Sequence, residues 1–367
     1  MMRGSLTQII QYEYDENNQL IRENNQQTGL TTLWTYSQDG NLSSKQVYPY
    51  TTGNDLSTLT ANYFYGYIRG TNKLQGYGDY QKFTYDELGN PLSYMNRTMS
   101  WEGRQLKTVN SGSNSISYTY NSDGLRRTKT VNGQTTVYEY SGTQLIHEQR
   151  PTFDLYYQYD ESGNLVKITK KQNTTTTNYY VATNIRGDVE AIYNESGQVQ
   201  ARYVYDAWGK VKSVLDANNN QITDTNHIGH INPFRYRGYY YDTETSFYYL
   251  QSRYYDPEVG RFINADGQIS DIGGDVLGYN LYTYCMNNPV NMSDSSGNWP
   301  RWITAAVTVV AAVVTVAAVE TGNIAVASVA AKITIAAGAT YIAQSAHYDR
   351  RETKNDVATL PQSPQEA

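Results

Sequence analysis

Aromatic and polar residues alternate along much of the chain. Tyr118-Thr119-Tyr120 is typical, because a strand would place its two rings on one face and the threonine on the other. Tyrosine, threonine and valine favour a pleated, half-buried surface, while glycine, asparagine and aspartate supply turns. The pattern therefore predicts an all-β fold made of many short strands.

A repeat organises this alternation. A tyrosine, often followed by aspartate, recurs at intervals of roughly twenty residues and precedes a glycine and then a leucine or valine. We expect the tyrosine to end one strand, aspartate to form an Asx-type turn, glycine to adopt a left-handed conformation, and leucine to open the return strand. Because one hairpin is marginally stable, successive hairpins should stack into a long, curled sheet. Clear copies are 85–92, 101–106, 120–125, 140–145, 159–165 and 205–211.

Composition narrows the classes of function. The chain has 37 tyrosines among 367 residues, which we expect to pack in the core or in cross-strand ladders. Its net charge of −6 disfavours nucleic acid as a partner. Cys285 is the single cysteine, so no intrachain disulfide forms, and we expect it to be a small buried hydrophobe. His227 and His230 have ligand spacing but no third ligand nearby, so neither a metal nor another cofactor is expected.

The longest motif follows the repeats. Residues 232–245 read NPFRYRGYYYDTET, residues 248–262 read YYLQSRYYDPEVGRF, and LYTY at 281–284 precedes NNPVN at 287–291. With the tyrosine–aspartate hairpins, this motif resembles the YD repeats and the repeat-associated core domain of Rhs and wall-associated polymorphic toxins, which also occur in the C subunit of insecticidal Tc toxins. The resemblance implies repeats over 1–225, forming part of a β-shell, and a core domain over 226–298.

In that family a pair of acids resembling an aspartyl protease cuts the chain after the core. The resemblance places these acids at Asp266 and Asp294, with Arg261 orienting an acid or the substrate strand. It places the cut immediately after Gly297, around Asn298 and Trp299. Such a pair works because two neighbouring carboxyls share a proton, so that one polarises the carbonyl while the other activates water.

Two alternatives to this site remain open. Local sequence alone favours turn capping for both aspartates, as is common for aspartate near glycine. Asp271 or Asp275 could also replace one of the acids. Two residues depart from the family pattern. Ser246 stands where a glycine is usual, which predicts a strained turn, and Ser295 stands where a proline is usual, which bears on processing.

Composition changes after Pro300. Residues 302–319 carry no charge over 18 residues, which is long enough for a membrane-spanning helix. An alanine-rich stretch over 322–343 follows, interrupted by Lys332. We expect residues 299–346 to be hydrophobic and helical and residues 347–367 to be polar and disordered. Residues 302–343 could contact a membrane, or could pack as cargo inside an apolar-lined shell.

The resemblance implies a fragment of a secreted or cell-surface toxin whose β-shell encloses and presents a C-terminal effector and cleaves itself. Its expected partners are that toxin, an immunity protein and the rest of the shell. The first ten residues contain no signal peptide, so the secreted or surface location comes from the resemblance alone. The alternative is a surface adhesion protein without catalytic activity, whose tyrosine-rich strands bind carbohydrate by stacking. Intact mass distinguishes the two hypotheses.

Overall fold

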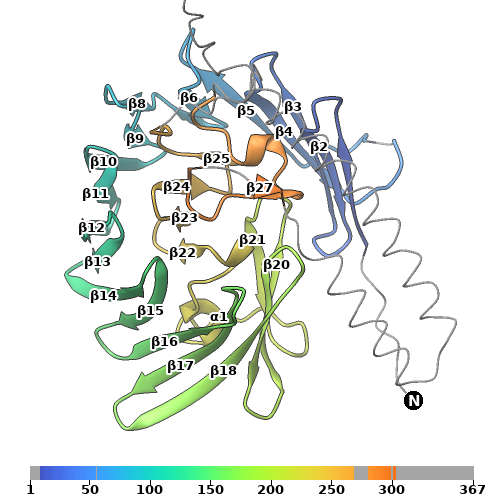
Figure 1. Cartoon of the computed structure of the whole chain (residues 1–367). Helices are drawn as coiled ribbons and strands as arrows, with labels where there is room; N and C mark the ends of the chain where they lie inside the picture. The colour runs from blue at the N-terminus through green and yellow to red at the C-terminus, as the bar shows by residue number, and fades with distance from the viewer. Residues whose placement is uncertain (1–8, 55, 268–279, 299–300, 303–367) are drawn as a thin grey trace, which may run out of the picture. The chain divides into compact units, whose positions relative to one another are not determined.

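The computed structural model describes residues 9–54, 56–267, 280–298 and 301–302. All of these except Trp302 belong to one compact unit. Three antiparallel sheets of seven, fourteen and four strands make up most of it, and within each sheet the strands follow chain order. Figure 1 shows the fourteen-stranded sheet running past the small four-stranded sheet. The predicted all-β fold with stacked hairpins is confirmed.

The repeats form the two larger sheets. The seven-stranded sheet contains β1 (Ile10–Tyr14), β2 (Leu20–Asn25), β3 (Leu30–Tyr36), β4 (Leu42–Pro49), β5 (Ala61–Tyr67), β6 (Leu74–Tyr77) and β7 (Tyr80–Gln81). The fourteen-stranded sheet contains β8 (Thr84–Tyr85), β9 (Pro91–Tyr94), β10 (Arg97–Glu102), β11 (Gln105–Ser111), β12 (Asn114–Tyr120), β13 (Arg126–Val131), β14 (Gln134–Ser141), β15 (Gln144–Gln149), β16 (Asp154–Tyr159), β17 (Leu165–Gln172), β18 (Thr175–Thr183), β19 (Val189–Asn194), β20 (Val199–Tyr205) and β21 (Val211–Leu215).

The remaining elements are short. The four-stranded sheet contains β22 (Tyr240–Asp242), β23 (Phe247–Leu250), β24 (Arg253–Asp256) and β25 (Arg261–Phe262). The other elements are α1 (Ile228–Ile231), the 3₁₀ turns η1 (Tyr236–Gly238) and η3 (Cys285–Asn287), and the strands β26 (Met292–Ser293) and β27 (Arg301–Trp302).

The repeat turns have the predicted chemistry. At Asp160 the Oδ1 atom accepts the backbone N–H groups of Ser162 at 2.9 Å and Asn164 at 2.8 Å, which is an Asx-type turn. Gly163 in the same turn has φ = +83°, a left-handed conformation that glycine adopts without steric cost. The turn thereby directs the chain from β16 directly into β17.

The repeat tyrosines make a contact that alternation alone does not reveal. The hydroxyl of Tyr159 donates to the carbonyl of Leu145 at 2.7 Å, and that of Tyr120 donates to Leu106 at 2.9 Å. Each bond therefore links a hairpin to the first or second residue of the return strand of the preceding hairpin. Trp101 does the same with its indole N–H, which lies 2.7 Å from the carbonyl of Pro91. We call these bonds the tyrosine latches. The other tyrosine hydroxyls that make one belong to Tyr36, Tyr67, Tyr140 and Tyr205.

The four-stranded sheet packs against the repeats through buried aromatic and charged groups. Arg126 of β13 is fully buried, and its guanidinium lies 4.6 Å from the ring centroid of Tyr240 and 4.5 Å from that of Tyr249. It forms a 2.6 Å ion pair with Asp242, whose other oxygen lies 2.9 Å from Lys129. A buried charge requires such a partner, so these ion pairs hold the repeats and β22 together.

The strained turn predicted at Ser246 is present. Ser246 lies between β22 and β23 with φ = +62°, in the left-handed region that residues with a Cβ rarely adopt. Of the predicted C-terminal segments, residues 303–346 and 347–367 lie outside the described residues. Within the described ranges, no helix has the length and apolar character needed to cross a membrane.

Candidate active site

The site is built on the turn between β23 and β24. Arg253, the first residue of β24, is buried, and its Nη2 atom lies 3.0 Å from Oδ2 of Asp266 and 3.3 Å from Oδ2 of Asp294. Both carboxylates are themselves buried. One guanidinium nitrogen therefore bridges the two acids that the resemblance pairs.

The repeats hold the segment that carries Asp266. The Ala265 N–H donates to the carbonyl of Gly89 at 3.3 Å, and the Ala265 carbonyl accepts from Arg104 at 2.7 Å. Gly89 has φ = +82°, and a Cβ there would lie 2.9 Å from that of Ala265. Because Gly89 has no side chain, this repeat turn lets the segment that carries Asp266 approach closely.

The chain after Asp294 folds back onto its own carboxylate. The Oδ1 atom of Asp294 accepts the N–H groups of Gly297 at 2.9 Å and Asn298 at 3.2 Å. The carbonyl of Gly297 accepts from Nε of Arg253, and that of Ser296 accepts from the Ser252 hydroxyl at 2.7 Å. The Gly297–Asn298 peptide bond is therefore held between Asp294 and Arg253.

Gly297 fits this position because it has no side chain. Its φ is +73°, and a Cβ would lie 2.6 Å from the carbonyl oxygen of Leu250 and 2.8 Å from the hydroxyl of Ser252. Contacts this short do not occur for real Cβ atoms, so the backbone at residue 297 lies directly on the turn that carries Arg253.

The geometry has the groups needed to hydrolyse a peptide bond. A charged donor on the carbonyl oxygen of Gly297 would stabilise the negative charge that develops there when water attacks. A carboxyl beside the Asn298 nitrogen is placed to exchange a proton with the leaving amine. A cleft of about 560 Å³ lies beside these groups, and the residues that line it include Arg253, Asn298 and Arg104.

The same bonds also fit turn capping. Acceptance by Asp294 of N–H groups three and four residues ahead is what an Asx-type cap does. Catalysis by Asp266 and Asp294 therefore stays a prediction. Trp299, Asp271 and Asp275 lie outside the described residues.

Arg261 lies elsewhere. Its Nη2 atom donates to the Asn72 carbonyl at 2.8 Å and to Oδ1 of Asn280 at 3.3 Å, and its guanidinium lies 5.0 Å from the ring centroid of Tyr67. The arginine that contacts both acids is Arg253, which sequence analysis did not single out. Its only signal was its place in the motif SRYYD.

The remaining candidates have structural contacts. His227 accepts the Gly229 N–H at 3.1 Å through Nδ1 and so caps α1, and a ring nitrogen of His230 lies 2.8 Å from the Ile222 carbonyl. The part of the chain that the structure describes contains no group of three or more His, Cys, Asp or Glu side chains able to hold a metal ion. Cys285 is buried, and burial raises the pKa of its thiol well above the ordinary value.

Comparison with known proteins identifies the family of this chain. The Teneurin YD-shell family model matches residues 2–290. The chain belongs to the Rhs/YD-repeat family of polymorphic toxins. It is 35% identical over 294 residues to the tRNA3(Ser)-specific nuclease WapA of Bacillus spizizenii, covering 78% of this chain and 12% of that protein. It is 26% identical over 338 residues to double-stranded DNA deaminase toxin A of Burkholderia cenocepacia, covering 80% of this chain and 23% of that protein.

A solved structure shares the fold. The crystal structure of TcdB2-TccC3-Cdc42 superposes with a TM-score of 0.61 at 19% sequence identity, covering 79% of this chain and 15% of that chain. At this identity the likeness shows the fold alone. This chain spans only a small part of these relatives, so their whole-protein activities do not transfer to it directly.

Proposed function

We propose that this chain is the C-terminal end of a YD shell that presents an effector lying after the core, and that the chain cleaves itself between Gly297 and Asn298. The observation that carries this proposal is the position of that bond. Arg253 contacts its carbonyl oxygen, and Asp294 contacts its nitrogen. We assign residues 1–225 to the repeats, 226–298 to the core, and 299–346 and 347–367 to the segment that is presented or, together with Asn298, released.

In the proposed reaction, water is the co-reactant. Asp266 accepts a proton from water as the water oxygen attacks the carbonyl carbon of Gly297, and Arg253 stabilises the resulting oxyanion. The protonated carboxyl of Asp294 then donates its proton to the nitrogen of Asn298 as the C–N bond breaks. The products are a carboxyl group at Gly297 and an amino group at Asn298. Asp294 is assigned the donor role because its carboxyl group adjoins the leaving nitrogen: in the intact chain its Oδ1 accepts the Asn298 N–H at 3.2 Å.

The proposed partners follow from the family. We propose the remaining shell, a C-terminal toxin and its immunity protein as partners, and a secreted or cell-surface location. β1 lies at the end of its sheet, so a further repeat strand could pair with it. For residues 302–343 we propose either contact with a membrane or packing as cargo inside the shell. No nucleic acid is proposed as a partner of the repeats.

Intact mass tests the cleavage. The full chain should separate into residues 1–297 and 298–367, and Asp294→Asn and Asp266→Asn should each remain whole because asparagine can neither share a proton nor act as a base. Asp271→Asn and Asp275→Asn are the matched controls and should cleave like the wild type. A wild-type chain that stays at 41.5 kDa would reject self-cleavage and favour a surface adhesion protein without catalytic activity. Ser295→Pro, which introduces the proline usual in the family at this exposed position, then tests whether the Ser295 departure alone accounts for the missing cleavage.

A further inference from the structure

The turn η1 lies between a repeat turn and the chain that leads to Asp294. Its central residue, Arg237, is buried and has φ = +55° and ψ = 18°. A non-glycine residue in this region carries backbone strain and persists only where its surroundings fix it. The contacts on both sides of Arg237 supply that constraint.

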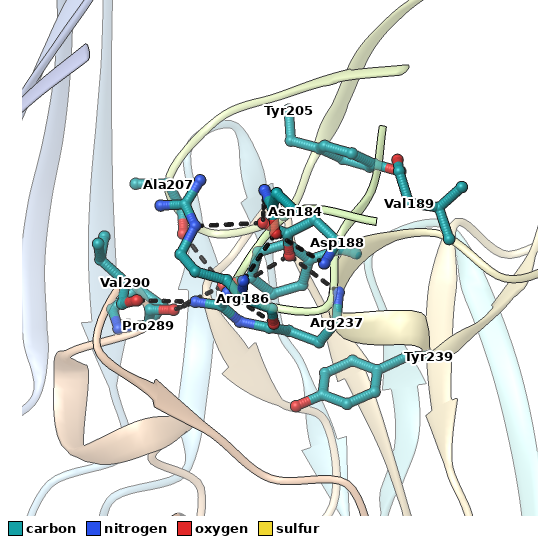
Figure 2. A network of polar contacts seen from close by, with 12 residues as sticks. Asn184, Arg186, Asp188, Val189, Tyr205, Ala207, Arg237, Tyr239, Pro289 and Val290 are labelled. Atoms are coloured by element: carbon teal, nitrogen blue, oxygen red, sulfur yellow. Dashed lines mark hydrogen bonds and ion pairs between the residues drawn. The ribbon is translucent and has the colours of Figure 1, made fainter. Parts of the chain in front are cut away.

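On one side, Arg237 binds the repeat turn that contains Asp188 (Figure 2). Its backbone N–H donates to Oδ1 of Asp188 at 3.0 Å, its Nη1 atom lies 3.4 Å from the same oxygen, and Nη1 also donates to the carbonyl of Arg186 at 3.2 Å. Asn184 and Arg186 orient the other oxygen of Asp188, at 2.9 and 3.3 Å. These two contacts thereby fix the orientation of the Asp188 carboxylate that binds η1.

On the other side, the same segment binds the chain before the predicted cut. Nη2 of Arg237 donates to the carbonyls of Pro289 and Val290, the latter at 3.0 Å. Two residues further along, the hydroxyl of Tyr239 accepts the backbone N–H of Asp294 at 2.7 Å. The segment therefore holds the 289–294 stretch at its start and at its end.

We propose that Asp188 and Arg237 are positioning residues for the cleavage, so that the bond after Gly297 is cut only when the repeat turn of residues 184–188 has docked on η1. This inference rests on the proposed function. The chain passes from Val290 through β26 to Asp294, and a shift at Arg237 moves the carboxylate relative to Arg253. Docking of the repeats thus couples completion of the fold to processing.

The chain contains a matched control for this coupling. Arg126 and Asp242 also form a buried ion pair between a repeat strand and the core segment, at 2.6 Å. Neither makes a hydrogen bond with residues 289–298 among the described contacts. Loss of this second pair should destabilise the fold without moving Asp294.

The test follows cleavage of the full chain over time after cell-free synthesis, by intact mass. Asp188→Ala should slow appearance of the 1–297 fragment at least tenfold, while Asp188→Asn, which keeps an acceptor for the Arg237 N–H, should recover most of the rate. Asp242→Ala should stay within about threefold of the wild type despite an equal or greater fall in melting temperature. If Asp188→Ala cleaves at the wild-type rate, or if both alanine variants slow in proportion to their lost stability, the inference is wrong.

A second readout separates this inference from the proposed cleavage. Hydrogen exchange at the Gly297 and Asn298 amides is measured in the Asp266→Asn background, or in the wild type if that does not cleave. Asp188→Ala should speed exchange at both amides, and Asp242→Ala should not. Unchanged protection in Asp188→Ala would overturn the positioning role even where cleavage itself never occurs. Faster exchange in a chain that does not cleave would support positioning and reject the proposed function alone.

Discussion

Arg253 donates through Nε to the carbonyl oxygen of Gly297, while its Nη2 atom contacts Asp266 and Asp294. A single side chain therefore links the bond that is predicted to break with both acids that are predicted to break it. The planar fork of arginine makes such simultaneous contacts possible, and a lysine ammonium does not reproduce them.

Arg253→Lys should therefore cleave about 10² to 10³ times more slowly than the wild type, which is the effect typical of removing one oxyanion donor. The measurement is the rate at which the 1–297 fragment appears. Arg261→Lys is the control, because Arg261 is an equally buried arginine of the same motif that contacts Asn72 and Asn280 instead. Equal cleavage rates for the two variants would show that Arg253 has no specific role in the cleavage.

Gly297→Ala should both stop cleavage and lower the free energy of unfolding by more than about 1 kcal/mol, because the new Cβ is strained by the positive φ and also meets the Leu250 carbonyl. Gly133 has a similar φ, +84° against +73° at Gly297, but no heavy atom within 4 Å of an added Cβ, so Gly133→Ala isolates the cost of φ alone. Chemical denaturation of both variants gives the difference. Similar losses would mean that the close approach at Gly297 is absent in solution.

Ser246→Gly should stabilise the chain by about 1 kcal/mol, since glycine adopts the left-handed region without the steric cost of a Cβ. Ser117→Gly, in the middle of β12 where φ is negative, should instead destabilise it by about 0.5–1 kcal/mol. Midpoints of urea unfolding measure both changes. A destabilised Ser246→Gly variant would show that the serine side chain contributes more than its backbone strain costs.

Burial, together with the neighbouring Asp206 carboxylate, raises the pKa of Glu23 to about 8. The stabilisation from this raised pKa is fully present below about pH 4, where the unfolded chain is also protonated, and is lost as pH rises toward 8. Glu23→Gln keeps the acceptor for Asn25, which lies 3.0 Å away, but cannot ionise. It should therefore gain stability relative to the wild type, by more than about 1 kcal/mol at pH 9.

Unfolding curves between pH 5 and pH 9 measure that gain. Glu102→Gln is the control, because its side chain is 75% exposed in an ion pair with Lys107. Its stability relative to the wild type should vary little with pH. A Glu23→Gln variant that follows the wild-type pH profile would place the Glu23 carboxyl in contact with water.

The hairpins could be predicted because their chemistry is local. The turn at Asp160 needs only residues 160 to 164, all of which are visible in one repeat. Arg253 and Arg237 could not be found in this way, since their partners lie far along the chain and follow no period. The acids Asp266 and Asp294 came from a family resemblance, and local sequence offered no reason to prefer Arg253 over Arg261.

The tyrosine latches show the same limit on a smaller scale. Alternation predicts which face a tyrosine ring occupies, but the hydroxyl reaches the preceding hairpin at a point where the strand register shifts, as between Gln158 and Tyr159. Such a bulge adds a residue to one strand and is not visible in an alternating pattern. The aromatic packing was therefore predictable, and its hydrogen bond was not.

Each tyrosine latch joins only neighbouring hairpins. The number of residues between the donor and the acceptor of the latch is therefore free to vary. The bond from Tyr120 to Leu106 spans 14 residues, and that from Tyr67 to Leu42 spans 25. Insertions at the far ends of the hairpins leave both partners in place. Evolution can therefore lengthen individual hairpins, or duplicate them, without changing the other hairpins of the sheet.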